Sequence, residues 1–79
     1  MPCFPGYRYC GPNCSGPGAP VNRLDAICKQ HDACYRKFGS NPICDERFLN
    51  QLKAIMNSRT KMGKDARYMY NAIQLKRLM

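Results

Sequence analysis

The sequence lacks several patterns that would define other kinds of protein. Its 79 residues hold no run near the roughly 18 apolar residues that a membrane-spanning helix needs. They also hold no strand-like alternation of any length, no internal repeat and no low-complexity tract. No C-x-x-C pair is followed by C-x-x-C or H-x-x-x-H, so a zinc site is only a minor alternative. The first six residues contain neither a basic stretch nor an apolar run, so no signal peptide is visible.

Six cysteines compensate for the small size of the chain. We expect a single domain over residues 1–79, because the chain is too short for two. A chain of this length buries only about 60–65% of its unfolded surface, so its apolar core is marginal without covalent support. An even cysteine count in so short a sequence indicates a disulfide framework and an oxidising compartment. The sequence therefore predicts a secreted or extracellular protein, either a mature domain or part of a longer exported parent.

Acidic residues are scarce in the second half of the chain. Residues 1–46 carry five basic and four acidic groups, a net charge of +1, whereas residues 47–79 carry eight basic groups and only Asp65, a net charge of +7. This asymmetry favours an anionic partner, either phospholipid headgroups or nucleic acid. The alternative is a solvated, solubilising helix face.

Local patterns predict an all-α protein that begins with a loop. Residues 1–20 are dense in Pro, Gly, Cys and Tyr, which favours a tight, cross-linked loop. A first helix is predicted over 22–38, with Asn22 and Asp25 at its start and Gly39 as its stop. Its apolar face comprises Leu24, Ile27, Cys28, His31, Cys34, Tyr35 and Phe38.

Two further helices are expected. The second covers 42–56, with Pro42 in its first turn, and residues 57–63 are interpreted as a break. The third, basic helix covers 64–78. We expect one face of it to point inward and its basic side chains to point toward water; the first set is Ala66, Met69, Tyr70 and Ile73, and the second is Lys64, Arg67, Lys76 and Arg77.

The first helix carries the candidate chemistry. His31 and Asp32 point about 100° apart on a helix, so they address two parts of one site rather than each other. This arrangement suits a general base beside a metal ligand. Asp45 is the best candidate for the carboxylate that orients the base, and a disulfide between Cys34 and Cys44 would lock the two helices together near it.

The loop at residues 9–13 can supply the oxygen ligands that Ca²⁺ requires. Gly11 and Asn13 tolerate left-handed backbone angles, so their carbonyl groups can turn inward. A disulfide between Cys10 and Cys28 would tie this loop down one helical turn before the histidine. Elimination leaves Cys3 to pair with Cys14.

These residues resemble the secreted phospholipase A2 superfamily. Tyr9-Cys10-Gly11 is similar to its calcium loop, residues 25–35 (DAICKQHDACY) match its C-x-x-H-D-x-C-Y helix, and Cys44-Asp45 matches its C-D pair. The Gly-Pro before Asn13 and the APVN entry at residues 19–22 also resemble the phospholipase domain of parvovirus minor capsid proteins. The resemblance covers residues 7–49 and implies a small, disulfide-rich phospholipase A2-like fold.

The resemblance also implies roles for individual residues. His31 would take a proton from the water that attacks the sn-2 ester of a glycerophospholipid, while Asp45 orients its ring and Tyr35 hydrogen-bonds to Asp45. Calcium would be held by Asp32 and by backbone oxygens; the latter come from Tyr9, Gly11 and Asn13. The family usually has glycine where Asn13 stands, and its long β-wing is missing here.

The expected function is thus a calcium-dependent phospholipase A2 acting on a phospholipid surface, preferably anionic. The location is extracellular, or within a larger exported protein or virion. A non-catalytic relative that binds a membrane or receptor is the main alternative. Nucleic acid is not expected as a partner, because the chain lacks the interleaving of aromatic and basic residues used for that purpose.

Overall fold

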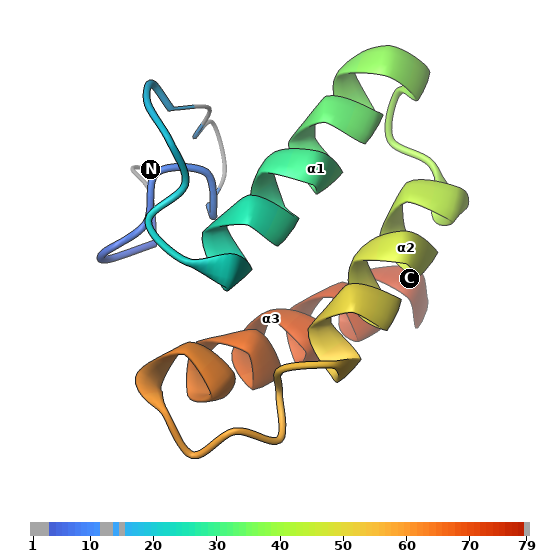
Figure 1. Ribbon diagram of the computed structural model, residues 1–79. Helices are drawn as coiled ribbons and strands as arrows, with labels where there is room; N and C mark the ends of the chain where they lie inside the picture. Colours follow the sequence, from blue (N-terminus) through green and yellow to red (C-terminus); the bar gives the residue numbers. More distant parts are fainter. Residues whose placement is uncertain (1–3, 12–13, 15, 79) are drawn as a thin grey trace.

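A computed structural model of the chain describes residues 4–11, 14 and 16–78, and within these ranges it has three helices and no strand. The helices are α1 (Arg23–Phe38), α2 (Pro42–Lys53) and α3 (Lys61–Leu78). In Figure 1, α1 and α2 form a hairpin and α3 passes beneath α2, against which it packs. The predicted all-α, disulfide-rich fold class is confirmed.

The limits of α1 follow from its capping residues. The side chain of Asn22 accepts a hydrogen bond from the backbone nitrogen of Asp25 at 2.9 Å, which satisfies a free N–H group at the helix start. At the other end, Gly39 adopts φ 77° and its N–H donates to the carbonyl of Tyr35. Phe38, predicted to lie on the apolar face, is 58% exposed, because it stands at the end of α1 beyond the core cluster.

The second helix ends three residues earlier than predicted. Asn41 caps it by accepting from the backbone nitrogens of the first turn, and Pro42 occupies its first position. After Lys53 the chain tightens into turns, in which Ala54 and Ile55 donate to carbonyls three residues back. This turn keeps the side chain of Ile55 buried, as its apolar spacing required.

The third helix begins three residues earlier than predicted, at Lys61. Thr60 caps it, since its hydroxyl accepts from the backbone nitrogen of Gly63 at 3.2 Å. We interpreted Gly63 as part of a break, but it is a packing residue. A Cβ atom there would lie 2.2 Å from the carbonyl oxygen of Ser58, so only glycine lets the first turn of α3 approach this backbone.

The core joins the N-terminal loop to all three helices. It consists of Tyr7, Tyr9, Cys10, Leu24, Ile27, Cys28, Phe48, Leu52, Ile55 and Ala66. The structure contains the disulfides Cys10–Cys28 and Cys34–Cys44, which join the loop to α1 and α1 to α2. The third expected disulfide, Cys3–Cys14, involves Cys3, which lies outside the described residues. Among the described helices, none combines the length and apolar character needed to cross a membrane.

Candidate active site

His31 and Asp45 face each other across the α1–α2 hairpin. The ring nitrogen Nε2 of His31 lies 3.0 Å from Oδ1 of Asp45, and their side chains are 12% and 7% exposed. The ring is held from two sides, stacked on Phe48 at a centroid distance of 4.2 Å and tilted against Tyr35 at 4.3 Å. The Cys34–Cys44 disulfide ties the two helices together beside this pair, since Cys44 directly precedes Asp45 and Cys34 lies three residues after His31.

Asp45 is an ionised carboxylate in this environment. Burial alone would raise its pKa, but the hydrogen bonds from Tyr35 and His31 and the charge of Lys76 outweigh burial and hold the pKa below its ordinary value. An ionised carboxylate only accepts hydrogen bonds, so Nε2 of His31 carries the hydrogen. In the neutral ring Nδ1 then holds the lone pair that a general base requires.

A cavity of about 420 Å³ opens beside His31. Most of its lining is apolar, and it is enclosed by the N-terminal loop and all three helices. The lining residues are Phe4, Tyr9, Gly11, Cys28, His31, Asp32, Tyr35, Phe48, Tyr68, Met69, Ala72 and Ile73. A general base and a carboxylate at the wall of an apolar cavity suit a substrate with a hydrocarbon part and a reactive polar group.

The loop at this cavity is held by Asp25, which is fully buried at the start of α1. Its carboxylate accepts hydrogen bonds from the backbone nitrogens of Arg8, Tyr9, Cys10 and Val21, the shortest being 2.8 Å from Tyr9. We expected Asp25 to be a carboxylate at the start of the first helix. It does lie at the helix start, but its main partners are loop amides from up to 17 residues away.

Asp32 has the features of a cation ligand. Its Oδ2 atom is buried and accepts no hydrogen bond within the described residues. Burial raises its pKa to about 6, and the nearby charge of Arg36 only partly offsets this effect. A buried carboxylate oxygen without a partner is costly, and a bound cation would remove that cost. Asp32 therefore fits the role of a calcium ligand.

The other oxygen ligands would come from the backbone. Among the described residues, no group of three His, Cys, Asp or Glu side chains is arranged to hold a metal. Tyr9 and Gly11 line the same cavity as Asp32, and Gly11 adopts φ 124°, a conformation that glycine reaches without strain. Oxygen donors of this kind suit Ca²⁺. The third expected backbone ligand, Asn13, lies outside the described residues.

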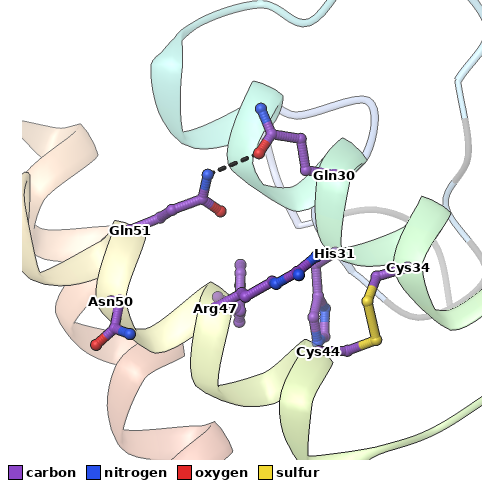
Figure 2. Close-up of a pocket in the computed structure, with 8 residues that line it drawn as sticks. Gln30, His31, Cys34, Cys44, Arg47, Asn50 and Gln51 are labelled. Carbon is purple, nitrogen blue, oxygen red and sulfur yellow. Dashed lines mark hydrogen bonds between the residues drawn. A yellow bond between two sulfur atoms is a disulfide. The ribbon is translucent and has the colours of Figure 1, made fainter.

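His31 also lines a second cavity, of about 300 Å³ (Figure 2). It lies between α1 and α2, and its lining includes Gln30 and Gln51, of which Gln51 donates to Gln30 at 2.6 Å. Neither Asp32 nor the loop lines this cavity. The candidate base His31, the candidate cation ligand Asp32 and the loop at Tyr9 and Gly11 all line the larger cavity. We therefore place the candidate reacting centre there.

Two basic side chains expected to point toward water contact the protein instead. Arg67 donates to the carbonyls of Met56 and Ser58 and so holds the turn between α2 and α3. Lys76 donates to the hydroxyl of Tyr35 and lies 3.7 Å from Oδ2 of Asp45. Lys76 was missed because its spacing on α3 is that of an exposed position, and no local pattern links it to a residue 41 positions earlier.

The sequence of this chain is similar to those of known proteins. A family model described as a phospholipase A2-like domain matches residues 2–69. An acidic phospholipase A2 of Bungarus fasciatus is 50% identical over 36 residues, which is 46% of this chain and 24% of that protein. A phospholipase A2 of Calliactis polypus is 50% identical over 42 residues, 52% of this chain and 25% of that protein.

The minor capsid protein VP1 of bovine parvovirus 1 is also similar. It is 41% identical over 59 residues, which is 63% of this chain and 9% of VP1. A further relative is named an acidic phospholipase A2 homolog, the taipoxin gamma chain of Oxyuranus scutellatus scutellatus. It is 47% identical over 36 residues, which is 46% of this chain and 22% of that protein. The chain thus spans a quarter or less of these relatives. No solved structure matches it.

Proposed function

Because this chain belongs to the phospholipase A2-like domain family, we propose that it is a calcium-dependent phospholipase A2 that cleaves the sn-2 acyl ester of glycerophospholipids. The products would be a fatty acid and a lysophospholipid. The observation that supports this proposal most strongly is the 3.0 Å contact between Asp45 and His31, which lines the same apolar cavity as Asp32.

His31 and Asp45 form the candidate catalytic dyad, and each has its own role. Asp45 accepts the Nε2 hydrogen of His31, so that Nδ1 takes a proton from the attacking water, and the same carboxylate stabilises the imidazolium that forms. Phe48 and Tyr35 keep the ring from rotating. Calcium, when bound by Asp32 and the loop oxygens, would polarise the ester carbonyl and stabilise the developing negative charge. The apolar lining of the cavity would take the acyl chain.

The proposed partner is an anionic phospholipid surface. Residues 47–79 carry a net charge of +7, and each basic residue near such a surface contributes about 1 kcal/mol to binding. Three apolar side chains of α3 are exposed among these charges: Tyr68, Leu75 and Leu78. We expect the protein to sediment more strongly with anionic than with zwitterionic vesicles, and we expect high salt to reduce this difference. Duplex DNA added as a competitor should not displace the protein from the anionic vesicles.

We place the protein outside the cell or in a virion. The disulfides Cys10–Cys28 and Cys34–Cys44 suit an oxidising compartment, and the relatives include a viral minor capsid protein.

Fatty-acid release tests the catalytic proposal. Anionic vesicles labelled in the sn-2 chain are incubated with the protein in calcium or in chelator, with sn-1 labelled vesicles as the positional control. We expect calcium-dependent release from sn-2 only, lowered roughly 100-fold or more in His31→Ala. Asp45→Asn should also lose activity, whereas Glu46→Gln, the same change at the exposed neighbouring position, should retain it. Equal release from the parent and His31→Ala would reject the proposal.

The alternative is a non-catalytic module that uses the same scaffold to bind a membrane or receptor. It is favoured by the similarity to a relative that is named a homolog of phospholipase A2. Calcium and vesicle binding by a folded parent that releases no fatty acid in the same assay would establish this alternative. Release that depends on His31 would exclude it.

A further inference from the structure

Lys76, in the last turn of α3, reaches the groups that lie behind the candidate dyad. Its Nζ donates to the hydroxyl of Tyr35, lies 3.3 Å from Oγ of Ser40 and lies 3.7 Å from Oδ2 of Asp45. The ammonium group also lies 4.8 Å from the centroid of the Tyr35 ring. These contacts are additional to the motif on which the proposed function rests, since the family match ends at residue 69.

The burial of the partner makes this contact more than an ordinary surface ion pair. The side chain of Lys76 is 47% exposed, but that of Asp45 is only 7% exposed, so water screens the carboxylate poorly. A single exposed pair rarely holds a lysine in one position, because ordering its side chain costs conformational entropy. Here a hydroxyl, a carboxylate and an aromatic ring hold the same ammonium group together.

The contacts form a continuous chain of hydrogen bonds and charges. Lys76 donates to Tyr35, Tyr35 donates to Oδ1 of Asp45, and the same Oδ1 accepts from His31. The hydrogen bond to Tyr35 raises the pKa of Lys76 more than its partial burial lowers it, so the ammonium stays charged. The charged and titratable groups that face Asp45 are His31 and Tyr35 from α1 and Lys76 from α3. Arg77 lines a surface hollow together with Asp45 and Lys76.

We propose that Lys76 is a positioning residue for the hydrolysis proposed above, and that it holds Tyr35 and Asp45 so that Oδ1 stays directed at His31. The inference rests on the proposed function. It also implies that the dyad is fully supported only when the last turn of α3 is docked against α1 and the start of α2.

The test compares three variants with the full chain. Lys76→Met removes the charge, Lys76→Arg keeps it, and Lys64→Met removes the same charge from an exposed position at the other end of the helix. The substrate is a short-chain phospholipid below its micellar concentration, so that a change in membrane binding does not enter the rate. Thermal unfolding and circular dichroism show whether each variant is folded.

We expect Lys76→Met to lower kcat about 2- to 5-fold with KM unchanged, while Lys76→Arg restores most of kcat. Lys64→Met should behave like the parent. Combining Lys76→Met with Asp45→Asn should lower kcat no further than Asp45→Asn alone, because Lys76 acts through Asp45. Equal kcat in Lys76→Met and Lys64→Met, or independent losses in the double variant, would overturn the role of Lys76.

A measurement without turnover separates this inference from the proposed function. The carboxyl carbon of Asp45, followed by ¹³C NMR, should titrate at higher pH in Lys76→Met than in the parent and be unmoved in Lys64→Met. An unmoved titration in Lys76→Met would overturn the inference whether or not the protein is active. A parent that releases no fatty acid would instead overturn the proposed function.

Discussion

The carboxylate of Asp25 lies 2.8 Å from the backbone nitrogen of Tyr9 and thereby joins the buried start of α1 to the candidate calcium loop. The same side chain accepts from three more backbone nitrogens, those of Arg8, Cys10 and Val21. One buried acidic side chain thus replaces the regular hydrogen bonding that an irregular loop cannot provide for itself.

Asp25→Ala should destabilise the protein by about 3 kcal/mol or more, because it leaves several buried N–H groups without an acceptor. Asp25→Asn, which keeps one acceptor oxygen, should lose less. Denaturant unfolding measures both, with Glu46→Ala as an exposed acidic control expected to change little. A stable Asp25→Ala would show that water or other groups satisfy these amides.

Asp32→Asn should stabilise the calcium-free protein at pH 8 by on the order of 1–2 kcal/mol, after allowance for solvent screening. Burial raises the pKa of Asp32 to about 6 from 3.8, so the folded state holds its proton more tightly between these values. The cost of ionising it in the folded state grows as pH rises from about 4 to 6, and is complete above 6. The benefit of the substitution should therefore vanish near pH 3.

Asp65→Asn is the matched control with the opposite sign. Burial would raise the pKa of Asp65, but the hydrogen bonds from Lys61 and Tyr7 outweigh it and lower the pKa. The ionised carboxylate of Asp65 therefore stabilises the folded protein at neutral pH, and this contribution is lost as pH falls through the folded pKa. Thermal unfolding from pH 3 to 8 should show opposite trends for the two variants. Parallel trends would contradict the assigned environments.

Added calcium should raise the melting temperature of the parent and leave that of Asp32→Asn nearly unchanged, because a ligand stabilises only the folded state that binds it. Magnesium at the same concentration serves as the control for ionic strength. A calcium response retained in Asp32→Asn would place the cation elsewhere.

Tyr35→Phe should lower kcat at least as much as Lys76→Met, since it removes the hydrogen bond to Asp45 and the acceptor for Lys76 together. Tyr70→Phe is the control, because it removes a hydroxyl that accepts from Gln74 on the same helix and does not line the candidate cavity. Steady-state kinetics on a monomeric substrate distinguish the two. Unchanged kcat in Tyr35→Phe would show that the hydroxyl does not support the dyad.

Gly63→Ala should destabilise the protein by about 1–3 kcal/mol, because the added Cβ atom meets the carbonyl of Ser58 at 2.2 Å and forces α3 away. Asn71→Ala, at an exposed position of the same helix, should be neutral or slightly stabilising, because alanine has the higher helix propensity. Urea unfolding compares them. A stabilised Gly63→Ala would return this residue to the role of a simple helix breaker.

Local patterns in the chain were sufficient for much of this structure. The caps Asn22 and Asn41 and the stop at Gly39 depend on neighbours within four residues, and they delimit the predicted first helix and the start of the second. The spacing within C-x-x-H-D-x-C-Y places His31 and Asp32 on adjacent directions of one helix. The family that this motif indicates is confirmed by the family match.

The remaining features depend on contacts between residues far apart in the chain, which no local spacing records. Lys76 and Gly63 were assigned from their own segment to water and to a helix break, but the packing of α3 turns one onto Asp45 and the other onto Ser58. Asp25 likewise acquires its partners only when the loop folds back on α1. Sequence periodicity determined which residues share a helix face, whereas tertiary packing decided what each face meets, because that depends on how the helices dock.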